Sequence, residues 1–172
     1  IGDLNGIVSR IDHIAGLGVD TVWLSPHFDS PNADNGYDVR DYRRVMAEFG
    51  TMEDFDRLLA ALGSRGMRLV IDLVVNHSSD EHEWFVGSRS SRNNPKRDWY
   101  VWSNTDQAYR DARIIFLDTE KSNWAYDPWT GQYYWHRFYS QQPDLNYDNP
   151  AVQQETLDIV DYWMGLGVDG FR

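Results

Sequence analysis

Residues 67–77 read Met-Arg-Leu-Val-Ile-Asp-Leu-Val-Val-Asn-His, and the predicted fold follows from them. The run is apolar on both faces, which is typical of a strand in a parallel sheet wrapped by helices. Asp72, Asn76 and His77 lie at or near its end. In a parallel α/β barrel the carboxyl ends of the strands form the floor of the active site, so these are candidate ligand contacts. The alternative is that they hydrogen-bond neighbouring loops.

The same order of helix, glycine and strand occurs three times. The spacing of apolar residues predicts helices followed by strands over 3–17 and 19–24, 51–65 and 67–77, and 149–166 and 168–172. Thr51 and Asp54 resemble a capping box, and Pro150 suits a first helical position. Tight turns before the strands and long loops after them favour parallel strands in an eight-stranded α/β barrel. A doubly wound open sheet would show the same asymmetry.

Residues 78–148 have no helical period and are too numerous for a structureless loop in a compact domain. We therefore expect a small inserted subdomain after the third barrel strand. It should contain a strand at 113–117 and a hairpin whose arms, 123–127 and 132–138, are joined by Pro-Trp-Thr-Gly. The aromatic residues of this segment either form its core or offer ring faces on which a sugar could stack. They are Trp99, Tyr100, Trp102, Trp124, Trp129, Tyr133, Tyr134 and Trp135.

The chain of 172 residues has a formal net charge of -11 and a pI near 4.7. Such a surface would be repelled by a phosphate backbone, which argues against nucleic acid as a partner. No apolar stretch has membrane length, and no cationic leader precedes an apolar segment, so no membrane partner is expected. The absence of cysteine fits a reducing cytosol and predicts a cytoplasmic location.

Four short motifs carry a resemblance to a known family. They are Asn-Gly-Tyr-Asp at 35–38, Asp-Leu-Val-Val-Asn-His at 72–77, Gln-Pro-Asp-Leu-Asn at 142–146 and Gly-Phe-Arg at 170–172. The last three resemble successive signature segments of the α-amylase family of retaining α-glycosidases. The glutamine of Gln-Pro-Asp-Leu-Asn resembles the oligo-1,6-glucosidase subfamily, which acts on short α-glucosides. Any one motif is a weak signal, but together the resemblance runs over essentially the whole chain.

The resemblance implies a partial (β/α)8 barrel with an aromatic-rich insertion. Residues 1–77 would be the N-terminal part of the catalytic barrel, 78–148 the inserted subdomain, and 149–172 a barrel helix and strand. A complete barrel needs about 250 residues, so we expect a partial sequence. In isolation it should be inactive and poorly folded, because its outer strands would have unpaired edges.

The family mechanism uses an aspartate nucleophile and a glutamate acid/base about 5 Å apart. By resemblance the nucleophile follows Arg172 by two residues, so no catalytic residue is expected within this sequence. Asp38 would hold a sugar hydroxyl, Tyr37 would stack under the ring, and His77 would donate to a hydroxyl. Arg172 would orient the nucleophile. Without the resemblance, Asp38 reads as a turn carboxylate and Arg172 as a surface charge.

Four further residues are expected near this site in structural roles: Asp72, Asn76, Gln142 and Asp144. Asp72 would lie inside the strand and fix neighbouring loops, whereas Gln142 and Asp144 receive no assigned contact. Ile1 to Asp3 resembles the tail of a calcium loop, in which Asp3 and the Ile1 carbonyl would be ligands. Hard cations need six or more oxygens, so we expect no tight calcium site here. No organic cofactor is implied.

The sequence leaves the reaction open. Residues 112–124 and 133–152 resemble trehalose synthases, which interconvert maltose and trehalose, although Gln141 departs from the histidine usual there. Residues 25–42 and 45–85 resemble sucrose isomerases and α-glucosidases. The expected substrate is an α-linked glucose disaccharide or oligosaccharide.

A non-catalytic relative, similar to transporter heavy chains, is the alternative of another class. The retained Asp38, His77 and Arg172 favour an enzyme, because a protein with no sugar to hold has no need of all three.

Overall fold

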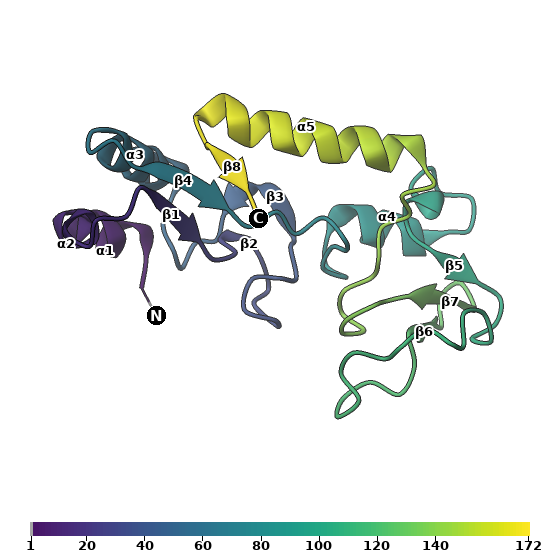
Figure 1. The fold of residues 1–172 in the computed structure, drawn as a ribbon. Coiled ribbons are helices and arrows are strands. Elements are labelled where there is room, and N and C mark those ends of the chain that lie inside the picture. The colour runs from purple at the N-terminus through teal and green to yellow at the C-terminus, as the bar shows by residue number, and fades with distance from the viewer. Residues whose placement is uncertain (1) are drawn as a thin grey trace. The chain divides into compact units, whose positions relative to one another are not determined.

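The computed structural model describes residues 2–172 and shows an α/β chain (Figure 1). The chain divides into two compact units. Unit 1 comprises the described residues up to Asp29, then Asp41–Leu73 and Leu157–Arg172. Unit 2 comprises Ser30–Arg40 and Val74–Thr156. The long helix α5 (Pro150–Leu166) belongs to unit 2 up to Thr156 and to unit 1 from there on.

Unit 1 contains a parallel sheet of three strands in the order β1-β4-β8. The strands are β1 (Thr21–Leu24), β4 (Arg68–Ile71) and β8 (Gly170–Phe171), and Figure 1 shows them side by side. In the central strand, Ile71 lies opposite Leu24 on one side and Phe171 on the other. The carboxyl ends of the three strands therefore meet at one edge. Their parallel arrangement confirms the prediction from the helix, glycine and strand order.

The helices of unit 1 begin where the sequence predicts, but the first one is interrupted. The predicted helix over 3–17 divides at Arg10 into α1 (Leu4–Ser9) and α2 (Ile11–Gly16). The amide of Arg10 donates to the carbonyl of Ile7, three residues back, which tightens the last turn of α1. Helix α3 (Met52–Gly63) has the predicted capping box, in which Thr51 and Asp54 exchange side-chain to backbone hydrogen bonds.

Two short strands of unit 1 were not predicted. β2 (Phe28–Asp29) pairs antiparallel with β3 (Asp41–Val45), so the segment after β1 is not entirely loop as expected. β2 has only two residues, and β3 reads Asp-Tyr-Arg-Arg-Val, which contains more charged than apolar residues, so neither gives a clear strand signal. Their buried Phe28 and Val45 join the core. Trp163 of α5 is fully buried there, with its ring centroid 5.0 Å from those of Phe28 and Phe55.

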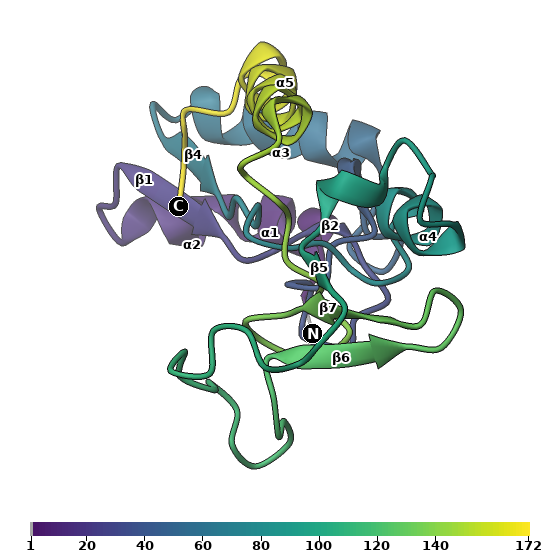
Figure 2. The same ribbon diagram turned by 90° about the vertical axis from the view of Figure 1, so that its right-hand side faces the viewer.

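Unit 2 contains an antiparallel sheet of three strands in the order β5-β7-β6. The strands are β5 (Trp102–Ser103), β6 (Trp124–Asp127) and β7 (Gln132–Trp135). Figure 2 shows them next to one another. The turn between β6 and β7 contains Gly131 in a left-handed conformation, with φ of 63°. The predicted hairpin is therefore confirmed.

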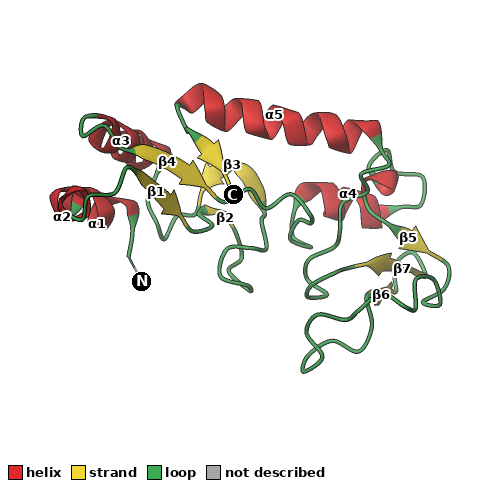
Figure 3. Cartoon of the chain, in the orientation of Figure 1, coloured by secondary structure: helices red, strands yellow, loops and turns green. Residues whose placement is uncertain are grey.

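Two predictions for unit 2 were wrong. Residues 83–90, in a region predicted to lack helices, form α4 (Glu83–Ser90), and a short 3-10 turn, η1 (Arg97–Trp99), follows. The predicted strand at 113–117 is irregular and turns at Phe116. Its backbone has no strand partner; instead, the side-chain nitrogen of Asn123 donates to the carbonyls of Ala112 and Arg113. Figure 3 shows how much of the chain between α4 and α5 is loop.

The apolar residues Val152, Leu157, Val160 and Trp163 predict the buried face of helix α5, and the structure confirms part of that face. Val152 and Trp163 are buried, whereas Leu157 is 57% exposed and Ile159, 1% exposed, lies in the buried face instead. The helix begins at Pro150 as predicted, and the amide of Ala151 donates to the side chain of Asn149.

Across residues 2–172 no helix is both long and apolar enough to cross a membrane.

Candidate functional site

Asp38 organises the loop Ser30–Arg40 of unit 2. Its carboxylate is 1% exposed and accepts hydrogen bonds from the amides of Ala33, at 2.8 Å, and Asp34, at 2.9 Å. Between Asp34 and Asp38 the backbone turns sharply, with φ of 51° at Asn35 and 90° at Gly36. Asparagine and glycine tolerate this left-handed region better than other residues. The alternative role considered from the sequence, a carboxylate that holds its own turn, is therefore present in the structure.

His77 is tied to the same loop through its ring. Nε2 lies 2.9 Å from the carbonyl oxygen of Tyr37, and Nδ1 lies 3.2 Å from the side-chain nitrogen of Asn76. A carbonyl only accepts, so Nε2 carries the proton and Nδ1 accepts from the Asn76 amide. Burial lowers the pKa of His77, while the hydrogen bond to Tyr37 and the charges of Asp34 and Asp38 oppose this shift. The ring is neutral, and its proton points at the loop.

Two of the quoted motifs lie side by side in unit 2. The segment 141–145 runs antiparallel to 76–80, with hydrogen bonds from the amide of Leu145 to Asn76 and from that of Asp80 to Gln141. Buried Gln142 donates to the Asp34 carboxylate at 2.9 Å and accepts from the Tyr139 amide. Gln142 therefore links its motif to the loop that Asp38 organises.

Asp144 is part of this pairing, opposite His77, and is 8% exposed. Its Oδ1 accepts from the side chain of Asn76 at 3.1 Å and from the amide of Arg137 at 3.0 Å. Burial raises the pKa of Asp144 to about 6, against the lowering effect of these hydrogen bonds. These hydrogen bonds give Asp144 and Asn76 contacts within the protein, and their place near a sugar site stays a prediction.

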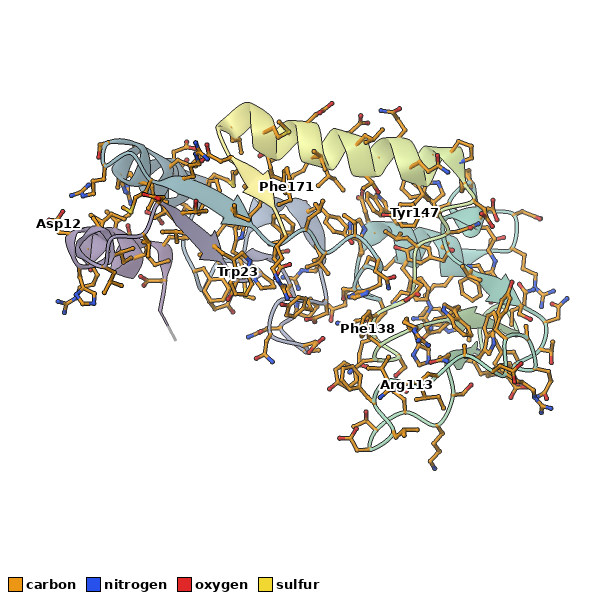
Figure 4. All side chains as sticks on the ribbon, in the orientation of Figure 1. Asp12, Trp23, Arg113, Phe138, Tyr147 and Phe171 are labelled. Atoms are coloured by element: carbon orange, nitrogen blue, oxygen red, sulfur yellow. The ribbon has the colours of Figure 1, made fainter. Side chains whose placement is uncertain are left out.

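In unit 1, Asp72 and Arg172 follow neighbouring strands directly. The strand predicted over 67–77 already ends at Ile71, so Asp72 follows β4 and does not lie inside it as expected. Arg172 follows β8, and the two side chains form an ion pair at 2.8 Å. The Asp72 side chain is 5% exposed and that of Arg172 is 58% exposed. The guanidinium also lies 4.8 Å from the ring centroid of Trp23 on β1. Figure 4 labels Trp23 and Phe171, the residue before Arg172. The parallel sheet therefore brings the side chains of Asp72, Arg172 and Trp23 together at its carboxyl edge.

The predicted site residues thus form two groups, one in each unit. Tyr37, Asp38 and His77 lie together in unit 2, with Asn76, Gln142 and Asp144 around them, and Asp72 and Arg172 lie in unit 1. That both groups surround a single sugar stays a prediction. Asp3 caps α1 by accepting from the Gly6 amide, and the predicted carbonyl ligand of Ile1 lies outside the described residues.

The sequence analysis missed two aromatic neighbours of the site. Phe138, which follows β7 (Figure 4), meets the ring of His77 at a centroid distance of 5.2 Å in a T-shaped arrangement. Trp23 lies beneath the Arg172 guanidinium. For Trp23 a signal existed, because a large aromatic residue near the end of a barrel strand borders the active-site edge. Phe138 was expected in the second arm of the hairpin, but β7 ends at Trp135, and beyond the strand the alternation of faces no longer tells where a side chain points.

Comparison with known proteins places the chain. The family model of the alpha amylase catalytic domain matches residues 1–172. The chain belongs to the α-amylase family. It is 58% identical over 172 residues to the trehalose synthase/amylase TreS of Mycolicibacterium smegmatis, covering all of this chain and 29% of that protein. Its identity to the oligo-1,6-glucosidase of Halalkalibacterium halodurans is 51%, covering all of this chain and 30% of that enzyme.

Solved structures of the α-amylase family have the same fold. The trehalulose synthase MutB from Pseudomonas mesoacidophila superposes with a TM-score of 0.93 at 51% identity, covering 100% of this chain and 31% of that one. The isomaltulose synthase SmuA from Protaminobacter rubrum gives 0.93 at 50% identity, with the same coverage. The chain thus spans about 29% to 31% of the proteins that it matches here.

Proposed function

We propose that this chain is part of a retaining enzyme that interconverts maltose and trehalose by intramolecular glucosyl transfer. The observation that carries the proposal is its 58% identity to a trehalose synthase over all 172 residues. Because the chain spans 29% of that relative, the activity belongs to the full-length gene product. The proposed substrate is an α-linked glucose disaccharide, and a structure of a MutB variant contains its substrate sucrose.

We further propose the partial (β/α)8 barrel and its three segments. Residues 1–77 and 149–172 would be barrel, and 78–148 the inserted aromatic-rich subdomain. The parallel order β1-β4-β8 supports the barrel, because each strand is joined to the next through a helix. The antiparallel sheet β5-β7-β6, which has no such crossover, supports the insertion.

In this proposal the loop of unit 2 holds the glucose ring. The Asp38 carboxylate accepts two amide hydrogen bonds, and its four acceptor positions leave capacity for a sugar hydroxyl. His77 directs its proton to the Tyr37 carbonyl, so its first contribution is to fix the position of Tyr37 and Asp38. For His77 to donate to a sugar hydroxyl, its Nε2 proton would have to give up the hydrogen bond to the Tyr37 carbonyl.

Arg172 would orient the nucleophilic aspartate. A guanidinium has five N–H donors in a planar fork, and the ion pair with Asp72 engages Nη1. Asp72 and the ring of Trp23 hold the guanidinium at the carboxyl edge of the sheet. A positive charge fixed there would keep a neighbouring carboxylate ionised, as a nucleophile requires.

The proposed reaction needs no organic cofactor. Calcium, with Asp3 as one ligand, is proposed only for the full-length protein. Among residues 2–172 no three His, Cys, Asp or Glu side chains gather so as to hold a metal ion. One Asp3 oxygen already caps α1. A tight calcium site would need further oxygen ligands, and no step of the proposed reaction passes through calcium. The cytoplasmic location likewise stays a prediction.

The deciding experiment is product analysis of the full-length gene product on maltose and on sucrose. Trehalose from maltose is the expected result, together with loss of turnover in Arg172→Lys, which cannot reproduce the planar fork. The matched control is Arg68→Lys, at the exposed start of β4. Glucose alone would instead indicate an α-glucosidase, and rearranged sucrose would indicate a sucrose isomerase. No turnover of either sugar would favour a non-catalytic relative.

The sucrose isomerase alternative has its own support. The solved structures of MutB and SmuA match at 50% to 51% identity over the whole chain. The oligo-1,6-glucosidase similarity is of the same size. The trehalose synthase proposal therefore depends on a difference of about seven percentage points in identity, from 58% to 51%.

A further inference from the structure

Unit 2 contains a pocket that none of the proposed glucose-site residues lines. Its volume is about 430 Å³, and its walls include the aromatic residues Tyr109 and Trp135 and the polar residues Asp98, Asn146 and Asp148. A pocket of several hundred Å³ with aromatic walls and a few convergent polar groups has the composition of a small-molecule site. All of these residues belong to unit 2.

Tyr109 is held in a conformation that tyrosine rarely adopts. Its φ is 53°, in the left-handed region, and among residues 2–172 the other non-glycine residues with positive φ are both asparagines. Burial of the ring does not offset this strain, because the side chain is 70% exposed. The ring is nearly parallel to that of Trp124, at 13°, and meets Trp135 edge-on at 5.7 Å. A strained backbone that presents a positioned, exposed ring is a feature found at binding sites.

The polar residues of the pocket are held in place by hydrogen bonds to one another. The side-chain amide of Asn146 donates to Asp98, to its carbonyl at 3.0 Å and to its carboxylate at 3.2 Å. The Asn146 side-chain oxygen in turn accepts from the amide of Asp148 at 3.1 Å. Within residues 2–172 the Asp148 carboxylate makes no hydrogen bond or ion pair, so it remains able to accept from a ligand.

We propose that this pocket binds an α-linked gluco-oligosaccharide at a second site, separate from Tyr37, Asp38, His77 and Arg172. A glucose unit would place the apolar face of its ring on Tyr109 and donate hydroxyl hydrogens to Asp98 and Asp148. The choice of an α-glucan rather than another polar ligand rests on the proposed function. The carboxylates and aromatic rings also suit an organic cation, which makes tetramethylammonium the competing probe.

The test measures binding of maltoheptaose to the full-length gene product by titration calorimetry. Tyr109→Gly removes the ring and suits a positive φ, so the fold should be retained. We expect at least tenfold weaker binding of maltoheptaose, with kcat/KM on maltose within twofold of the parent. The matched control is Tyr126→Ala: Tyr126 lies on β6, is 57% exposed and does not line the pocket. It should bind maltoheptaose like the parent.

Three outcomes would overturn the site. They are unchanged maltoheptaose binding in Tyr109→Gly, a loss of maltose turnover in proportion to the loss of binding, and Tyr109-dependent binding of tetramethylammonium without binding of maltoheptaose. Failure of the proposed function looks different. If the parent protein leaves maltose unconverted but binds maltoheptaose through Tyr109, the proposed reaction is wrong and the second site stands.

Discussion

Unit 1 and unit 2 hold their functional candidates by different means. In unit 1, Asp72 and Arg172 each follow the end of a parallel strand, so the sheet itself places them. In unit 2, Asp38 and His77 lie on irregular chain and are placed by hydrogen bonds between side chains and backbone. The first arrangement depends on an apolar core and the second on individual polar contacts. Damage to the core should therefore disturb unit 1, and loss of one polar group should disturb unit 2.

The largest effect should come from Trp163→Ala. Trp163 is fully buried in the core of unit 1, and its Nε1 donates to the Tyr42 carbonyl at 2.8 Å. Removing a buried aromatic side chain typically lowers the free energy of unfolding by about 3–5 kcal/mol. Urea unfolding of the full-length gene product measures the loss. The neighbouring Met164→Ala, at a 57% exposed position, should change stability by about 0.5 kcal/mol or less. Equal effects would refute the core that we describe.

Acid should weaken unit 1 through His27. This ring is 2% exposed, stacks on Phe55 and makes no hydrogen bond from either nitrogen among residues 2–172, although the Ser25 backbone lies close enough to favour the charged ring slightly. Burial lowers the pKa of His27 to about 4, below the ordinary 6.5. The unfolded chain therefore binds the proton more readily, and stability falls as the pH drops from about 6.5 to 4.

The predicted loss from His27 is about 3 kcal/mol, from about 1.4 kcal/mol per pH unit of pKa shift. His27→Leu should remove this part of the pH dependence. The measurement is urea unfolding of parent and variant at several pH values. Parallel curves for the two proteins would mean that His27 is not buried as neutral imidazole.

Asp144 should give unit 2 the opposite pH dependence. Burial raises the pKa of Asp144 to about 6, above the ordinary 3.8, so the folded state binds this proton more tightly. The contribution to stability therefore falls as the pH rises from about 4 to above 6, by about 3 kcal/mol. Asp144→Asn keeps an acceptor for Asn76 and Arg137 without the charge. The difference between variant and parent should grow with pH; a constant difference would contradict the assignment.

Asp38→Asn should loosen the loop Ser30–Arg40 of unit 2. The substitution replaces one carboxylate oxygen by an amide nitrogen, which is a donor. That nitrogen would face the backbone N–H of Ala33 or Asp34, so one of the two hydrogen bonds would be lost. A hydrogen bond to a charged group contributes about 1.5–3 kcal/mol, so we expect a loss near 2 kcal/mol. Amide exchange in residues 30–40 should quicken. Asp118→Asn, at an exposed position, is the control, and loop exchange should be the same in it as in the parent.

The smallest expected effect is that of Gly131→Ala in the hairpin turn. With φ of 63°, alanine would be strained, and its Cβ would lie 3.6 Å from an Arg92 nitrogen. The cost should be about 1 kcal/mol. Gly16→Ala, at the end of α2 with nothing within 4 Å of the added carbon, should be neutral or stabilising. Thermal unfolding scans of both variants measure the difference. Equal unfolding temperatures would contradict the left-handed conformation of Gly131.

The sequence by itself determined the features that depend on neighbouring residues. The capping box at Thr51 and Asp54, the hairpin turn ending at Gly131 and the start of α5 at Pro150 all agree with the structure. The parallel strands were predictable because a glycine joins each helix closely to its strand. In these cases a few adjacent side chains and the allowed backbone angles decide the local conformation. The motifs also identified the family.

Only the tertiary structure decided which distant groups meet. Asp72 pairs with Arg172 across 100 positions, and Gln142 reaches Asp34 across 108. The proton of His77 is directed by the carbonyl of Tyr37. No local pattern encodes such contacts, because each depends on how the chain packs and on the need of a buried polar group for a partner.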